Sequence, residues 1–199
     1  MIQFTDMTGL TSSALAMAAM AIMLPGVARI PKPYRIGLTC AIVLIALIPF
    51  GELPLAAYVR GVTGDLSIVS TILLLLAILN RLTGWQPFDV QSRFVLFFLV
   101  ALTALGLYPT SLGIGYFDPY RFGYGNLWFI VVLLVIALAA CFRQLQAIAL
   151  AIALAVFAWG VSWYESTNLW DYLLDPLLAI YAISALMKRC IQMQRKQQG

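Results

Sequence analysis

Long apolar stretches recur along almost the whole chain, and they constrain its fold more than any other feature. We find seven of them, at residues 9–28, 35–51, 66–82, 94–109, 127–142, 145–164 and 168–187. A helix needs about 20 residues, within a range of about 17 to 25, to cross the hydrocarbon core of a membrane. The stretches therefore predict an all-α, polytopic membrane protein built as a bundle of about seven transmembrane helices.

Composition favours a membrane over water as the surroundings of this chain. Hydrophobic residues make up 63% of the 199 residues and charged residues only 10%, against about 25% charged residues in typical soluble domains. A soluble protein of this size has too little interior to bury so many apolar side chains. Because the connections between stretches are short, we predict one transmembrane domain over residues 1–199 and no soluble domain.

Three prolines affect the count of membrane spans. Pro49 and Pro54 interrupt the end of the second stretch, and the fourth stretch is short before Pro109. Segment 50–65 contains helix-breaking prolines and glycines, so it either lies in the membrane interface or enters the membrane and returns. Six spans plus such a re-entrant segment is the alternative to seven.

The distribution of charge predicts an orientation. If seven spans begin with an N-terminus outside the cytoplasm, all but two of the twelve Lys and Arg residues fall on the cytoplasmic side, and Arg60 and Arg121 fall outside. All but one of the eight acidic residues fall outside, Asp89 being the exception. Lys and Arg are enriched in cytoplasmic loops. The pattern predicts a cytoplasmic C-terminus and favours a bacterial plasma (inner) membrane.

The absence of histidine excludes several classes of function. Neither a Ser-His-Asp nor a Cys-His relay can form, and histidine-ligated haem or metal has no ligand. The three cysteines show no CxxC spacing, and no glycine-rich phosphate-binding motif occurs. We therefore expect no cofactor and no metal. The basic C-terminal tail is expected to contact membrane lipids and not nucleic acid.

The last apolar stretch contains two carboxylates four residues apart. If Asn168 caps a helix, Asp171 lies in its first turn, and Asp175 lies about 6 Å deeper on the same face. A carboxylate below the membrane interface usually faces the bundle interior and touches a polar partner. We expect the polar partner of Asp175 to be an outer arginine, a tyrosine hydroxyl or water. Because Pro176 follows, we expect the helix to be kinked or broken at this point. In the simpler interpretation, Asp175 caps a helix that begins at Pro176.

The outer loop 108–126 contains further candidate ligand-binding residues. Asp118, Tyr120 and Arg121 lie among several aromatic residues, and we expect this loop to fold over the helix bundle. Arginine in such a loop can bind a phosphate or carboxylate group. The simpler interpretation is that the aromatic residues anchor the loop in the membrane interface and that Asp118 begins a turn.

The first outer loop adds Glu52 and Arg60 to the candidate ligand-binding residues. These two side chains can form an ion pair with each other, and Arg60 can also reach another outer carboxylate. Thr63 or Asp65 is placed to cap the helix of the third stretch, because side-chain oxygens satisfy free backbone N–H groups there.

Two classes of function fit these features. The first is a non-catalytic subunit or scaffold of a cell-envelope assembly that holds a membrane-protein partner. The run SALAMAAMA in the first stretch offers small residues for such a contact, although packing within the same bundle explains it equally well. The second is an outward-facing enzyme or carrier for an anionic, lipid-like substrate, in which Asp171 and Asp175 do acid–base chemistry without histidine.

Overall fold

The computed structural model describes the backbone of residues 4–197 and the side chains of residues 6–195, so the ends of the predicted 1–199 domain lie outside it. In chain order, the α-helices are α1 (Phe4–Met23), α2 (Lys32–Leu47), α3 (Leu55–Thr63), α4 (Ile68–Thr83), α5 (Val90–Ser111), α6 (Leu127–Phe142), α7 (Gln146–Gly160), α8 (Leu169–Leu173) and α9 (Pro176–Gln197). Two 3-10 helices, η1 (Pro25–Arg29) and η2 (Pro119–Gly123), and a hairpin of β1 (Pro49–Phe50) with β2 (Leu53–Pro54) lie between them. The prediction of an all-α fold is confirmed.

The number of membrane spans is not confirmed by helix length. Each of the seven apolar stretches forms helix, but among the described residues only Asp6–Met23 and Val90–Ser111 are long and apolar enough to cross a membrane. Helices α4, α6 and α7 contain 15 or 16 residues, which corresponds to about 23 Å. They end early because turn residues follow them. Gly84, for example, stops α4 in a left-handed conformation with φ of 80°.

Segment 50–65 is neither a long loop nor a transmembrane helix. Its first part is the β1–β2 hairpin, with a turn at Gly51 and Glu52, and its second part is the nine-residue helix α3. The prediction of a cap at Thr63 or Asp65 is wrong. Ser67 caps α4 by accepting a hydrogen bond from the Ser70 backbone N–H at 3.1 Å.

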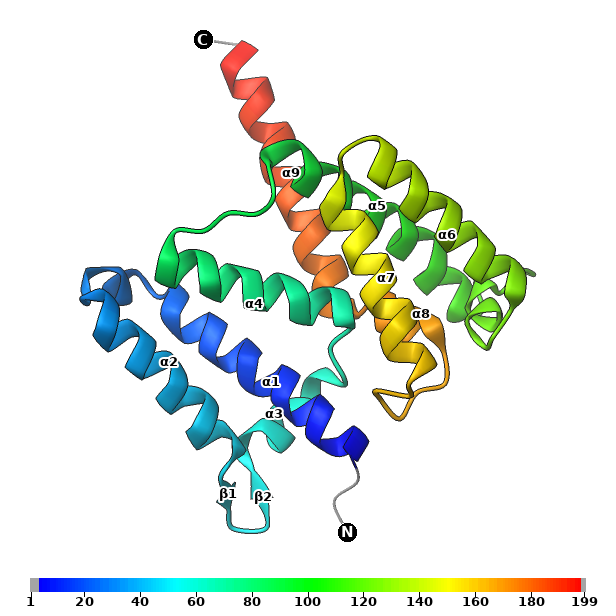
Figure 1. The fold of residues 1–199 in the computed structure, drawn as a ribbon. Helices are drawn as coiled ribbons and strands as arrows, with labels where there is room; N and C mark the ends of the chain where they lie inside the picture. The colour runs from blue at the N-terminus through cyan, green and yellow to red at the C-terminus, as the bar shows by residue number, and fades with distance from the viewer. Residues whose placement is uncertain (1–3, 198–199) are drawn as a thin grey trace.

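The helices form two groups that meet through α4 and α7 (Figure 1). Helix α1 packs against α2, α3 and α4, whereas α5 packs against α9 and α6 against α7. Helix α7 also contacts α4 and α5, which joins the groups. The small residues of α1 lie at its internal contacts. Ala14 and Ala18 are fully buried in clusters formed with α2, α3 and α4, so this run packs within the same molecule.

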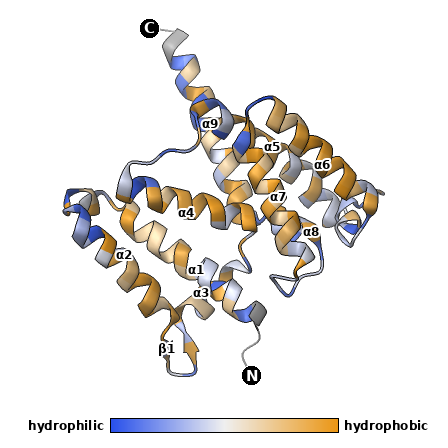
Figure 2. Cartoon of the chain, viewed as in Figure 1, coloured by the Kyte–Doolittle hydropathy of each residue, from blue (hydrophilic) through white to orange (hydrophobic). Residues whose placement is uncertain are grey.

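Hydrophobic residues run along most of the helices (Figure 2), and many of the large ones are exposed on the surface of the molecule. Helix α6 is the clearest case, since only Leu133 and Ala140 of its sixteen residues are buried. Trp128 and Phe142, at its two ends, have exposed fractions of 77% and 85%. A helix that is apolar on all sides is typical of a protein interior or a membrane, and most of α6 is not in this protein's interior.

The last apolar stretch forms a broken helix, one of the two predicted forms, and Asp175 caps the helix that begins at Pro176, as in the simpler interpretation. Helix α8 ends at Leu173, Leu174 is extended, with φ of −143° and ψ of 137°, and α9 begins at Pro176. Proline is favoured at the first helical position because it lacks a backbone N–H, and the N–H of that position has no partner within the helix. The break brings the backbone around Asp175 to the start of α4, where the candidate site lies.

Candidate functional site

A cavity of about 360 Å³ lies between α8, η2, the end of α5 and the start of α9. Its ionisable and hydroxyl-bearing lining residues are Asp65, Tyr108, Tyr120, Tyr164, Ser166, Asp171 and Asp175. Lys and Arg are absent from its lining in the described part of the chain. Both predicted catalytic carboxylates and the predicted Tyr120 therefore share one cavity, together with a third carboxylate at Asp65.

Asp175 is buried in this site, with an exposed fraction of 3%. Its Oδ2 atom accepts hydrogen bonds from the Ser67 backbone N–H at 3.0 Å, from the Ser67 hydroxyl at 2.7 Å and from the Ser70 hydroxyl. Its Oδ1 atom accepts a bond from the Leu178 backbone N–H at 2.9 Å, which caps α9. Asp175 thus faces the interior, as predicted, but its partners are serines and backbone groups, not arginine or tyrosine.

Asp171 lies at the junction of α8 and η2. The Tyr120 hydroxyl donates to both of its carboxylate oxygens, at 2.8 and 3.0 Å, and the Ser166 hydroxyl donates to its Oδ2. Burial, followed by the hydrogen bond to Asp171, raises the pKa of Tyr120 well above its usual value. The phenol therefore remains a donor at physiological pH, and it orients Asp171 in the cavity.

Loop 108–126 is docked on the bundle through η2. The side-chain amide of Asn168 donates to the Tyr120 carbonyl at 3.0 Å, and the Trp170 indole donates to the Pro119 carbonyl at 3.0 Å. Gly123 lies so close to Asn168 that a Cβ atom there would be 1.6 Å from its Oδ1 atom. The prediction that this loop folds over the bundle agrees with these contacts.

The Tyr108 hydroxyl lacks a hydrogen-bond partner in the part of the protein that the structure describes. Tyr108 lies near the end of α5 and lines the cavity, and its hydroxyl oxygen is buried without a hydrogen bond among the described residues. A buried polar atom left without a partner costs about 1–3 kcal/mol. The cavity therefore contains a hydroxyl that a ligand or a water molecule can satisfy.

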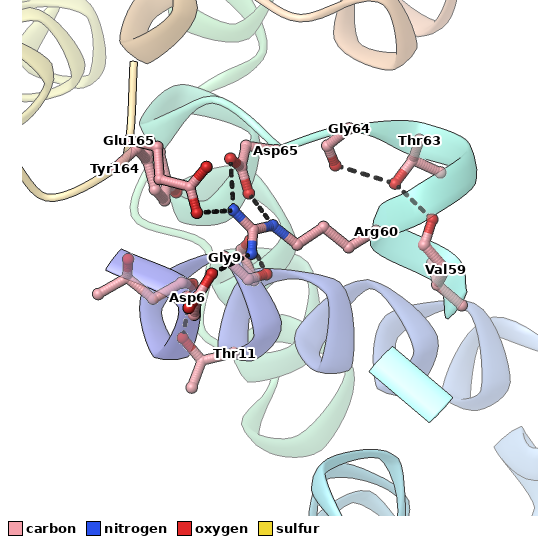
Figure 3. A network of polar contacts seen from close by, with 12 residues as sticks. Asp6, Gly9, Thr11, Val59, Arg60, Thr63, Gly64, Asp65, Tyr164 and Glu165 are labelled. Carbon is pink, nitrogen blue, oxygen red and sulfur yellow. Dashed lines mark hydrogen bonds and ion pairs between the residues drawn. The ribbon is translucent and has the colours of Figure 1, made fainter. Parts of the chain in front are cut away.

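Arg60 forms the centre of an ion-pair network beside the cavity (Figure 3). Its guanidinium binds Asp65 through two bonds, at 2.6 and 3.0 Å, and it reaches Asp6 at 3.2 Å and Glu165 at 3.3 Å. These partners come from the α3–α4 connection, from α1 and from the loop after α7. The hydrogen bond to Asp65 is the main cause that raises the pKa of Arg60, so the guanidinium stays charged.

The remaining predicted ligand-binding residues lie outside the cavity. Arg121 is exposed, stacks 6.0 Å from the centre of the Phe122 ring, and forms no ion pair within the described range. Asp118 is exposed and caps η2 by accepting from the Tyr120 backbone N–H at 3.0 Å, as its simpler interpretation predicted. Glu52 lies in the exposed hairpin turn and does not pair with Arg60.

Several residues of the site were not predicted from the sequence. Ser67, Ser70, Tyr108 and Ser166 contact Asp175, Asp171 or the cavity, yet each is an ordinary polar residue at the edge of an apolar stretch. Ser67 alone carried a signal, because serine before an apolar run is typical of a helix cap.

The arrangement presents carboxylates and hydroxyl groups to a ligand. Among residues 6–195, no group of three or more Cys, Asp or Glu side chains is placed to hold a metal ion. The carboxylates accept hydrogen bonds from tyrosine, serine and backbone donors. A comparison with protein-family models, curated proteins and solved structures finds no match to this chain.

Proposed function

We propose that this chain is a multi-pass protein of a bacterial plasma membrane, and that it binds a small ligand carrying an amine or another cationic group in the acidic cavity, as a carrier does. The observation that carries the proposal is the lining: Asp65, Asp171 and Asp175 meet there with three tyrosines and without a basic residue. The cavity volume of about 360 Å³ lies at the small end of the range of ligand sites, about 300–1,000 Å³.

Two features support the membrane part of the proposal: the exposed apolar helices and the contacts among segments that are expected on the same side of the membrane. The exposed apolar helices suit contact with lipid chains. The segments expected outside the cytoplasm meet one another, since Arg60 binds acids from three of them and Tyr120 binds Asp171. In this proposal, seven stretches cross the membrane with the N-terminus outside, and the shorter helices rely on flanking turns and local membrane thinning.

The charge of the lining favours a cationic ligand over the anionic one expected from the sequence. An anionic ligand needs an arginine with free donors, but Arg60 already binds three carboxylates. Arg121 does not line the cavity. A cation instead finds negative charge at Asp171, whose hydrogen bonds come from the neutral hydroxyls of Tyr120 and Ser166. The aromatic faces of Tyr120 and Trp170 can add cation–π attraction.

Thermal unfolding in mild detergent tests the ligand class. Ethanolamine, tetramethylammonium and spermidine are the cationic probes, and glycerol phosphate and acetate are the anionic probes, all at one ionic strength. We expect at least one cationic probe to raise the unfolding midpoint, because a ligand that binds only the folded state stabilises it. Asp171→Asn should reduce this shift, whereas Asp118→Asn, which alters an exposed carboxylate outside the cavity, should retain it.

Two other results would contradict the proposal. Stabilisation by glycerol phosphate alone would reverse the sign of the ligand and restore the anionic substrate. No shift with any probe would remove the carrier function and favour the scaffold.

The scaffold, a non-catalytic subunit that holds a membrane-protein partner, is the second candidate. It is favoured by the C-terminal part of α9, which extends beyond the other helices (Figure 1). Purification in mild detergent tests it, because a stable partner should remain bound to the full chain and be lost when residues 188–199 are removed.

A further inference from the structure

A second cavity lies at the other end of α4, among basic residues. Its volume is about 540 Å³, and its polar lining residues are Arg35, Asn80, Arg81 and Gln86. Arg35 belongs to the first turn of α2, and Asn80 and Arg81 belong to the last turn of α4. Helix α4 therefore separates this basic cavity from the acidic one. At the other end of the helix, its N-cap residue Ser67 binds Asp175 of the acidic cavity.

Hydrogen bonds to carbonyl groups hold both arginines in place. The Arg35 Nη1 atom donates to the Arg81 carbonyl at 2.9 Å, and the Arg81 Nε atom donates to the Ile22 carbonyl at 3.3 Å. Neither guanidinium pairs with a carboxylate within the described part of the chain, in contrast to Arg60. Two fixed positive charges thus share one cavity without a counter-charge.

Most hydrogen-bond donors of this cavity remain unused. A guanidinium has five N–H donors, and one donor atom of each arginine is bonded. The Arg35 Nε atom is buried and has no acceptor among residues 6–195. The side-chain amides of Asn80 and Gln86 add further donors at the wall. The cavity therefore lacks an acceptor with a negative charge.

We propose that this basic cavity binds a phosphate group. The planar fork of a guanidinium matches the oxygens of phosphate, and two such forks with adjacent amides can surround one tetrahedral anion. Ala28 and Ala77 line the cavity with small side chains, which leaves space for the group.

The phosphate can belong to a lipid headgroup or to a soluble anion. Met23 lines the cavity. Met20, Met23 and Leu24 are exposed, so they provide an apolar surface for acyl chains. Basic pockets between transmembrane helices on the cytoplasmic side are known sites for anionic headgroups. The proposal itself rests on the donors of the cavity and is independent of the ligand in the acidic cavity.

Titrations of the full chain in non-ionic detergent test this proposal. The probes are short-chain phosphatidylglycerol and inorganic phosphate, each compared with chloride at the same ionic strength. Arg35→Gln removes one guanidinium from the cavity. Arg143→Gln is the matched control, because Arg143 is an exposed arginine at the end of α6 and does not line the cavity.

We expect one of the probes to bind, and Arg35→Gln to weaken its binding about tenfold, as loss of a charge-assisted bond pair predicts. Arg143→Gln should bind as the unaltered protein does. Binding of phosphatidylglycerol alone assigns the phosphate to a lipid, and binding of inorganic phosphate assigns it to a soluble anion.

Equal weakening in both arginine variants would overturn the proposal, because it would mean unspecific attraction to positive charge. Absence of binding by both probes would overturn it as well. If Arg35→Gln does not fold, Asn80→Ala replaces it, since the Asn80 side chain has no hydrogen bond to another described residue. The Asn80→Ala variant retains both arginines, and it should weaken the binding of the same probe.

Discussion

Asp175 joins two helices that are more than one hundred residues apart in the sequence. Its Oδ2 atom binds the backbone N–H and hydroxyl of Ser67 at the start of α4, and its Oδ1 atom binds the Leu178 N–H at the start of α9. A carboxylate can do this because both of its oxygens only accept hydrogen bonds when it is ionised. Together with the hydrogen bond from the Ser70 hydroxyl, these bonds compensate for burying the carboxylate without a basic partner.

Asp175→Asn is expected to lower the free energy of unfolding by about 1–3 kcal/mol, the cost of leaving a buried donor unsatisfied. An asparagine amide has one acceptor oxygen, so its NH2 group must face either the Ser67 donors or the Leu178 N–H. Thermal or denaturant unfolding in mild detergent measures the change. Asp118→Asn is the control, because Asp118 is exposed and caps only η2. Equal stability of the two variants would mean that Asp175 is a simple cap.

Because Asp175→Asn is expected to destabilise the fold, it is a poor test of a catalytic role for Asp175. Asparagine caps a helix about as well as aspartate, but here it cannot also serve the second helix. Loss of activity in Asp175→Asn therefore does not identify a catalytic role. Asp171 is the better residue for that question, since its partners are the side chains of Tyr120 and Ser166.

At the scale of elements, η2 and α8 close the acidic cavity together. Asn168 caps α8 with its Oδ1 atom, through the Trp170 N–H at 2.9 Å, and its amide nitrogen binds the Tyr120 carbonyl. Phe129 of α6 packs against the Trp170 ring at a centroid distance of 4.4 Å, which adds an aromatic contact behind α8. One asparagine thus begins a helix and fixes the loop that covers it.

Gly123→Ala should separate η2 from α8 and destabilise the protein by about 1–3 kcal/mol, the usual cost of overpacking. The added Cβ atom would lie 1.6 Å from the Asn168 Oδ1 atom, so the backbone or the cap must move. The unfolding midpoint and the shift with cationic probes should both decrease.

Gly106→Ala is the matched control for this prediction. Gly106 lies in α5, and a Cβ atom there would meet nothing within 4 Å. Alanine is also the better helix former, by up to about 1 kcal/mol. A Gly123→Ala variant as stable as Gly106→Ala would contradict the docking of η2.

At the scale of the whole molecule, two clusters of charged residues lie at opposite ends of α4. Near its start, Asp6, Asp65 and Glu165 meet at Arg60. Near its end, Arg35 donates to the Arg81 carbonyl and Arg81 donates to the Ile22 carbonyl. In each cluster, the charged residues are ones that the predicted orientation assigns to the same side of the membrane.

A reporter fused to the C-terminus is expected to be active only in the cytoplasm, and one inserted within residues 110–125 only outside it. The enrichment of Lys and Arg at one end motivates this orientation. Paired fusions of a cytoplasmic fluorescent reporter and a periplasmic phosphatase measure it. An active phosphatase at the C-terminus would contradict the proposed topology, whatever the number of spans.

Much of the site could be predicted because its chemistry is rare in an apolar chain. Asp171 and Asp175 could be predicted as site residues because they are carboxylates inside an apolar stretch, and both line the cavity. The partners of Arg60 could not be ranked, because Asp6, Asp65, Glu165 and Glu52 all lie on the same predicted side. Only the packing of α1 against α3 brings Asp6 within 3.2 Å and leaves Glu52 in an exposed turn.

The helices, their breaks and the separation of charge could be predicted locally, because they follow from hydrophobicity, from proline and glycine, and from counts of charge. Which acids share a cavity depends on how the helices pack, and so do the bonds from Ser67 and Ser70 to Asp175. The same packing saturates Arg60 with carboxylates and leaves a free donor on Arg35. Side-chain partners from segments that are distant in sequence depend on how helices cross, and local patterns do not encode that geometry.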